Sequence, residues 1–195
     1  MGLLHRIDVD PQVAERLAQL DVRDDGYGVD AFGLDRSWLP LGLALTRGLY
    51  RHWFRVESRG HENLPRSGAG IVAANHSGTL PFDASMLWAD ILRKSNPPRL
   101  GRAVADQFVA NLPFVSTLFA RTGAIGSSRG NLERVLERGD LVIVFPEGTP
   151  GIGKRFSERY KLQRWRVGHV ELALRHRVPV IPTAIVGAEE QMPQV

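Results

Sequence analysis

The sequence predicts an α/β fold: a mostly parallel twisted sheet flanked by helices, preceded by an N-terminal amphipathic helical segment. Short apolar runs at residues 71–74, 141–145 and 180–186 are rich in β-branched residues, which is typical of buried strands. Stretches with helical periodicity separate these runs. Strands that alternate with helices favour a parallel sheet covered by helices, because crossover helices pack against its faces.

Two segments precede the predicted sheet. Residues 1–36 are polar, rich in Asp and punctuated by Gly, so we expect a short helix with irregular flanks. Residues 38–55 form the amphipathic helix, apolar at first and then mixing aromatic residues with three arginines at four-residue spacing. Such a helix can lie in a lipid interface or pack on the sheet. We therefore divide the chain into a polar segment, 1–36, and a domain, 37–195.

The remaining elements follow from periodicity and from the residues that interrupt it. We expect a loop over 60–70, because Leu64-Pro65 breaks a helix, and a second break at Asn96-Pro97-Pro98. Gly139 ends a short amphipathic helix. The predicted order is strand 71–74, helix 84–93, strand 99–104, helical pieces over 106–120 interrupted at Pro113, helix 131–138, strand 141–145, a basic loop, helix 167–176 and strand 180–186.

Polar motifs follow two of the predicted strands. The run Asn75-His76-Ser77-Gly78-Thr79-Leu80-Pro81-Phe82-Asp83 comes directly after strand 71–74. Phe145-Pro146-Glu147-Gly148-Thr149 comes at the end of strand 141–145. Because α/β folds build their sites from residues just past the carboxyl ends of strands, these motifs predict an active site.

An imidazole with a nearby carboxylate is suited to acyl transfer. His76 is the candidate general base, because imidazole can take a proton from an attacking hydroxyl and return it to the leaving group. Asp83 would fix the tautomer and stabilise the imidazolium. The chain has no cysteine and no Gly-x-Ser-x-Gly elbow, so direct attack by the substrate hydroxyl is the simpler scheme. Backbone N–H groups of residues 77–79 (Ser77, Gly78 and Thr79) are candidate oxyanion donors.

The two motifs together resemble the glycerolipid acyltransferase superfamily, and residues 55–190 carry the resemblance. Six residues separate His76 from Asp83, where the commonest pattern of the superfamily has four. This longer form is similar to the lysophospholipid acyltransferase branch related to monoacylglycerol and diacylglycerol acyltransferases. The stretches 151–154, 159–164 and 186–190 resemble the same branch.

The resemblance implies an O-acyltransferase of the 1-acylglycerol-3-phosphate acyltransferase-like fold. It would move a fatty acyl group from acyl-CoA or acyl-carrier protein, as co-substrate, to a glycerolipid hydroxyl: a lysophospholipid, a monoacylglycerol or a diacylglycerol. It implies neither a metal nor another cofactor. The substrate-binding residues that it implies are Glu147, Gly148, Thr149, Arg129 (with Arg121 as the weaker match), Lys154 and Arg155. The last two are candidate substitutes for an arginine of the phosphate-acceptor enzymes whose place is taken here by Pro150.

Composition bounds the partners. The 195 residues suffice for one domain with an appendage, and the lack of cysteine fits a reducing compartment. The net charge of +4 favours an anionic membrane or CoA phosphates, since no nucleic-acid module is found. Without a long apolar run or a signal-peptide pattern, we expect a cytoplasmic protein peripherally associated with membranes. The basic run 154–166 is either an anion site or a solvated face.

Several alternatives stay open. Asp83 would also serve as the N-cap of the following helix, Glu147 as a solvent-facing turn residue and Arg129 as a solvated loop residue. The whole protein could be a catalytically idle binder of lipid or acyl-CoA, or a thioesterase-like hydrolase that uses water. Relatives in the superfamily usually continue for some tens of residues beyond the last predicted strand. We therefore also expect a domain truncated at its C-terminus.

Overall fold

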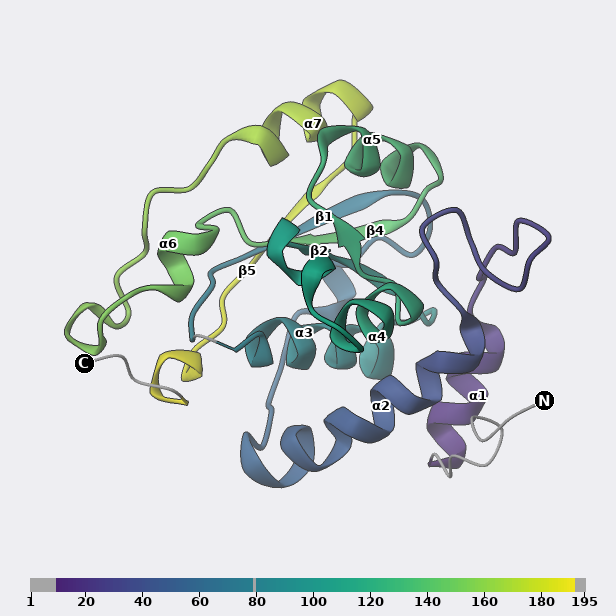
Figure 1. The fold of residues 1–195 in the computed structure, drawn as a ribbon, viewed down its shortest axis with the longest axis horizontal. Coiled ribbons are helices and arrows are strands. Elements are labelled where there is room, and N and C mark those ends of the chain that lie inside the picture. The colour runs from purple at the N-terminus through teal and green to yellow at the C-terminus, as the bar shows by residue number, and fades with distance from the viewer. Residues whose placement is uncertain (1–9, 79, 192–195) are drawn as a thin grey trace.

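The computed structural model, described here for residues 10–78 and 80–191, has one five-stranded parallel sheet between two layers of helices (Figure 1). The strands are β1 (Gly70–Ala74), β2 (Gly101–Ala105), β3 (Ile125–Gly126), β4 (Leu141–Val144) and β5 (Val180–Thr183). Their order across the sheet is β3-β2-β4-β1-β5, and every neighbouring pair is parallel. The predicted α/β fold with a parallel sheet is therefore confirmed.

The helices cover both faces of the sheet. They are α1 (Pro11–Gln19), α2 (Leu39–Gly48), α3 (Phe82–Lys94), α4 (Val115–Arg121), α5 (Arg129–Glu137), α6 (Thr149–Ile152) and α7 (Gly168–His176). Short 3₁₀ turns lie at Arg36–Trp38, His61–Asn63, Gln107–Asn111, Phe156–Glu158 and Ala188–Glu190, and a π-helical turn at Leu49–Trp53. One apolar cluster joins the sheet to α1, α2 and α3, and a second joins it to α5 and α7.

The two central strands are buried along their whole length and divide their side chains between the two clusters. In β4, Leu141 and Ile143 belong to the cluster with α3, whereas Val142 and Val144 belong to the cluster with α5. This alternation follows from the strand period of two. Burial on both faces explains why these strands read as continuous apolar runs in the sequence.

The observed bounds differ from the predicted ones at the sheet edges. β5 ends at Thr183, not at residue 186, because it pairs only with β1 and β1 ends at Ala74, opposite Thr183. β3 and α6 were not predicted, since two and four residues are too short to show a period. The helix predicted over 38–55 is α2 followed by the π-helical turn.

The segment of α2 and the π-helical turn packs on the core through one face. Leu39, Leu43 and Tyr50 are buried, while Leu45 and Trp53 are exposed. A Cβ at Gly42 would lie 2.9 Å from the ring of Trp88, so glycine permits the close approach of α2 to α3. In the described ranges, no helix is long and apolar enough to cross a membrane.

A buried carboxylate, Asp90 of α3, links this helix to the segment between α2 and β1. It accepts hydrogen bonds from the Tyr50 hydroxyl and from Ser58 Oγ, the latter at 2.7 Å. His61 Nε2 and Lys94 Nζ lie 2.7 and 3.2 Å from its two oxygens. Burial alone would raise the pKa of Asp90, but these hydrogen bonds and the charge of Lys94 hold that pKa below its usual value.

We predict that Asp90→Asn lowers the free energy of unfolding by about 3 kcal/mol at neutral pH, because a buried charge network loses its acceptor. The folded-state pKa is depressed, so this stabilisation is fully present above the unfolded pKa of about 3.9. It is lost as the pH falls through the lower folded value, and the difference between the two proteins should shrink on acidification. Urea unfolding at several pH values measures this, with exposed Glu137→Gln as control. A difference that does not vary with pH would contradict the charge argument.

Candidate active site

The register of β1 and β4 brings the two sequence motifs together. Ala73 lies opposite Val144, and His76 and Glu147 each follow that pair by three residues. Both strands are parallel, so the chain leaves them at the same edge of the sheet. There Glu147 Oε1 accepts a hydrogen bond of 3.0 Å from the backbone N–H of His76. The two motifs are therefore in direct contact.

Asp83 holds the imidazole of His76. Its Oδ2 lies 2.6 Å from His76 Nδ1 and accepts the backbone N–H of Ser77 at 3.0 Å, and its Oδ1 accepts the N–H of Ala84 at 2.7 Å. Asp83 lies inside the first turn of α3, whose N-cap is Pro81, so the N-cap alternative for Asp83 is wrong. Because a carboxylate only accepts, Nδ1 carries the proton of this hydrogen bond.

The second ring nitrogen of His76 is left for a substrate. The ring stacks on Phe145 with centroids 4.3 Å apart and planes 27° from parallel, which fixes its orientation together with Asp83. The side chain is 16% exposed. Nε2 has no hydrogen-bond partner among residues 10–78 and 80–191. This nitrogen can therefore accept a proton from a hydroxyl that approaches from the carboxyl edge of the sheet.

The structure describes two of the three residues predicted to donate backbone N–H groups to an oxyanion. The N–H of Ser77 already binds Asp83, so it is not free for an oxyanion. Gly78 has a φ of +82°, a conformation that glycine adopts readily. Thr79 lies outside the described residues. The Ser77 hydroxyl is buried and lacks a hydrogen-bond partner in the described part of the chain, so it is a further polar group beside His76.

Glu147 is a buried hub, not a solvent-facing turn residue, since it is only 1% exposed. Besides the N–H of His76, it accepts the backbone N–H of Gln163 at 2.8 Å through Oε2. Lys154 Nζ lies 3.5 Å from the same oxygen and 2.7 Å from Glu189 Oε1. The carboxylate thus positions the histidine backbone, and the buried ammonium of Lys154 is balanced by two carboxylates.

Two glycines, Gly148 and Gly151, have close neighbours at the position where a Cβ would lie. A Cβ at Gly151 of α6 would lie 2.8 Å from Glu147 Cβ and 3.0 Å from the His76 carbonyl oxygen. Gly148 has a φ of +60°, and a Cβ there would lie 3.6 Å from the guanidinium of Arg166. The arginine therefore lies over the turn that holds Glu147.

The other predicted binding residues lie in different surroundings. Thr149 begins α6, and its Oγ1 is 3.4 Å from Asp106 Oδ2, just past β2. Arg155 is exposed and lines a small cavity with Gly78 and Lys154. Arg129 begins α5 and makes an ion pair of 3.3 Å with Glu133 within that helix and one of 3.5 Å with Glu171 of α7. These ion pairs do not include the His76 cluster.

Sequence reasoning did not assign roles to four residues that shape the site: Phe145, Gly151, Gln163 and Glu189. Gln163 acts through its backbone N–H, which gives no signal in the side chain. Glu189 stands in the stretch 186–190, but nothing in the sequence pairs it with Lys154. In the described ranges, no group of three or more His, Asp or Glu side chains could hold a metal ion.

The fold and the site define an α/β protein with an imidazole–carboxylate pair at the carboxyl edge of a parallel sheet. The acyltransferase family model matches residues 55–186, which contain both motifs. The chain belongs to this family and, with it, to the glycerolipid acyltransferase superfamily.

Similar proteins occur in mycobacteria. Uncharacterized proteins of Mycobacterium tuberculosis and Mycobacterium bovis are each 41% identical to this chain over 171 residues, and one of Mycobacterium leprae is 39% identical. These matches cover 87% of this chain and 47–48% of the relatives, so the chain spans about half their length. No solved structure matches it significantly.

We predict that Gly151→Ala displaces Glu147 or His76, because a methyl group has no room there, and lowers the free energy of unfolding by about 1–3 kcal/mol. Gly153→Ala is the matched control. A Cβ at Gly153 would lie 3.4 Å from the Thr149 carbonyl oxygen, a contact that small adjustments relieve. Urea unfolding of both variants measures this. Equal behaviour of the two variants would show that the close approach at Gly151 is not required.

Proposed function

We propose that this protein is an O-acyltransferase that moves a fatty acyl group from acyl-CoA, or acyl-carrier protein, to the hydroxyl of a glycerolipid. The single observation that carries the proposal is the His76–Asp83 pair, 2.6 Å apart, on the motif of a glycerolipid acyltransferase superfamily member. His76 is the general base, and Asp83 is the positioning residue behind it.

The proton path follows from the geometry. The substrate hydroxyl gives its proton to His76 Nε2 while its oxygen attacks the thioester carbonyl carbon. The resulting imidazolium is stabilised by Asp83 through Nδ1. When the tetrahedral intermediate collapses, the carbon–sulfur bond breaks and the thiolate takes the proton from Nε2. The products are the acylated glycerolipid and a free thiol, and His76 returns to its starting state.

Charges near His76 suggest where anionic substrate groups bind. Lys154 is neutralised by Glu147 and Glu189, which leaves little of its charge for a substrate. Arg155 is exposed beside Gly78 and has no ion-pair partner in the described part of the chain. Arg166 lies over the Gly148 turn. We assign these two arginines to phosphate groups of the donor or of a lysophospholipid acceptor. If the acceptor has no phosphate, only the donor phosphates would bind there.

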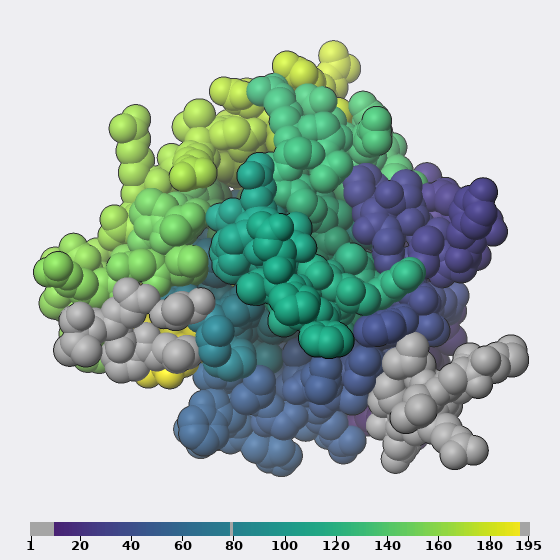
Figure 2. Space-filling view, viewed as in Figure 1, coloured from purple at the N-terminus to yellow at the C-terminus, as the bar shows by residue number. Residues whose placement is uncertain are grey.

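An apolar surface at the catalytic edge supports contact with a membrane. Phe108, Leu112, Phe114 and Val115 are exposed in the segment that follows β2, and Phe114 is 89% exposed. In Figure 2 this teal segment lies on the surface that faces the viewer. β2 runs parallel to β4, so its carboxyl end lies at the same edge of the sheet as His76. Acyl chains could thus pass from the lipid to the site without crossing water.

We predict that His76→Ala lowers acyl transfer by about 1,000-fold, because the attacking hydroxyl loses its base. The measurement is thiol release from a long-chain acyl-CoA in mixed micelles, with and without lysophosphatidate, other lysophospholipids, monoacylglycerol or diacylglycerol. His52→Ala, at an exposed histidine of the π-helical turn, is the matched control and should keep the rate of the unchanged protein. The acceptor that stimulates release identifies the acceptor class.

The same assay separates the alternatives. Undiminished transfer by His76→Ala would refute the assignment of the base. Release that does not depend on any acceptor would indicate a thioesterase, in which water takes the place of the glycerolipid. Saturable binding of acyl-CoA without release would indicate a catalytically idle binding protein.

We predict that Phe114→Asp weakens binding to anionic liposomes by about tenfold, because the substitution replaces apolar area that would be buried in lipid with a charge. Tyr27→Asp is the matched control: Tyr27 is also 89% exposed, but it lies in the segment between α1 and α2. Liposome flotation of the two variants gives the comparison. If both variants bind as well as the unchanged protein, the membrane contact lies elsewhere.

A further inference from the structure

A cavity of about 280 Å³ lies at the edge of the sheet opposite His76, where strands begin. It is lined by Gly68, just before β1, by Arg99 and Leu100, just before β2, and by Asp140, just before β4. The segment between α1 and α2 closes its other side; Figure 1 shows that segment, in dark purple, at the amino end of the sheet. We call it the arginine cavity.

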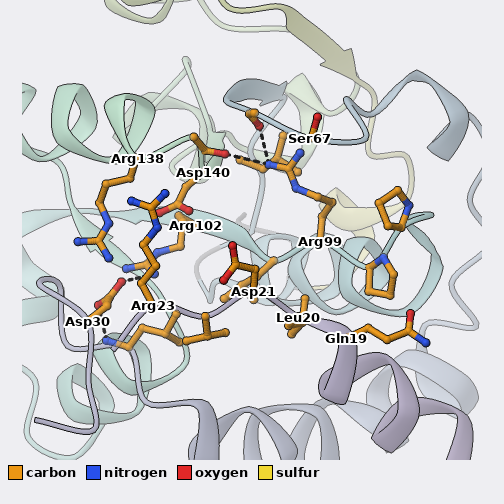
Figure 3. A pocket seen from close by; sticks show the side chains of 18 of the residues that line it. Gln19, Leu20, Asp21, Arg23, Asp30, Ser67, Arg99, Arg102, Arg138 and Asp140 are labelled. Carbon is orange, nitrogen blue, oxygen red and sulfur yellow. Dashed lines mark hydrogen bonds and ion pairs between the residues drawn. The ribbon is translucent and has the colours of Figure 1, made fainter. Parts of the chain in front are cut away.

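Positive charge is in excess around the arginine cavity. Five arginines and three aspartates line it: Arg23, Arg66, Arg99, Arg102, Arg138, Asp21, Asp30 and Asp140 (Figure 3). Figure 3 shows Arg23, Arg102 and Arg138 gathered on one side, with Asp30 beside them. Such an excess of guanidinium groups around a hollow favours an anionic ligand.

Arg102 of β2 is a buried guanidinium with only part of its hydrogen bonds made. It is 2% exposed, and its Nη1 donates to Asp30 Oδ2 at 2.7 Å. Its Nε and Nη2, and the Nε of Arg138, are buried and have no hydrogen-bond partner among residues 10–78 and 80–191. Buried N–H groups of charged side chains normally find acceptors, because leaving them unpaired costs free energy.

The aspartates of the cavity do not accept hydrogen bonds from these unpaired N–H groups. The Oδ1 of Asp30 already accepts the backbone N–H groups of Phe32 and Leu34, each at 2.9 Å. Asp140 makes no ion pair with Arg102 or Arg138. Burial raises the pKa of Asp140, although the charges of these two arginines oppose the shift.

Arg99 has a different, structural role. Its guanidinium donates to the carbonyl oxygens of Pro65, Gly68 and Gly139 at 2.7–3.2 Å, and it thereby ties together the loops that enter β1 and β4. These three hydrogen bonds hold Arg99 in place at the cavity wall. The unsatisfied donors belong to Arg102 and Arg138.

We propose that the arginine cavity binds the phosphate group of a small soluble ligand, separately from the catalytic edge. A tetrahedral phosphate offers several acceptor oxygens at once, which suits two or three converging guanidinium groups better than a single carboxylate does. The cavity has room for the phosphate and a small organic group.

The test is isothermal titration calorimetry with inorganic phosphate and with glycerol 2-phosphate, at constant ionic strength set with chloride. We expect saturable binding, with a Kd that rises at least tenfold in Arg138→Gln. Arg102→Lys keeps the charge but loses the planar fork, and it should weaken binding similarly. Arg138 lies partly at the surface, so its variant keeps the test valid if Arg102→Lys fails to fold.

Controls separate this site from the catalytic edge. Arg134→Gln, at an exposed arginine of α5, and His76→Ala should both bind phosphate like the unchanged protein. Asp140→Asn should lower the Kd, because it removes a negative charge from the wall. Absence of saturable binding, equal weakening by Arg134→Gln, or weakening by Arg166→Gln in place of Arg138→Gln would overturn the proposal. Binding of phosphate only when it is presented on phosphatidate vesicles would overturn the assignment to a soluble ligand.

Discussion

The parallel register of β1 with β4 is the constraint on which the site depends. Once Ala73 is placed opposite Val144, the chain segments after both strands must emerge side by side at one edge. The strand register alone then brings His76 and Glu147 next to each other. The two helical layers maintain this register, because each central strand packs apolar side chains into both clusters. Core packing on both faces of the sheet therefore sets the geometry of the polar site at its end.

The central part of the fold could be predicted from the sequence, because β1 and β4 are buried on both faces and carry uninterrupted apolar runs. Sequence periodicity does not predict the shortest elements or the strand ends at the edges of the sheet. β3 pairs over two residues and α6 has four, so neither is long enough to show a period. The end of β5 depends on where its partner β1 ends, and this is information that no local window contains.

The candidate site was predictable where residue type and chemistry coincide. The imidazole and carboxylate of His76 and Asp83 are recognisable from their spacing, and the structure places them 2.6 Å apart. Glu147 was recognisable as a residue of the site but not as a buried acceptor of two backbone amides. The ion pair of Lys154 with Glu189 depends on how the loop after α6 folds back, so the family resemblance predicts a substrate-binding cation where the structure has a neutralised one.

The two hydrogen bonds of Glu147 also have a consequence for local unfolding near the site. One carboxylate accepts the amides of His76 and Gln163, which come from segments far apart in the chain. The basic run 154–166 cannot detach from the site without breaking the hydrogen bond between the Gln163 N–H and Glu147 and exposing Lys154. Local unfolding of the loop and loosening of the histidine turn should therefore occur as one cooperative event rather than as two independent ones. Any ligand that orders the loop would, by the same coupling, also rigidify the backbone of the base.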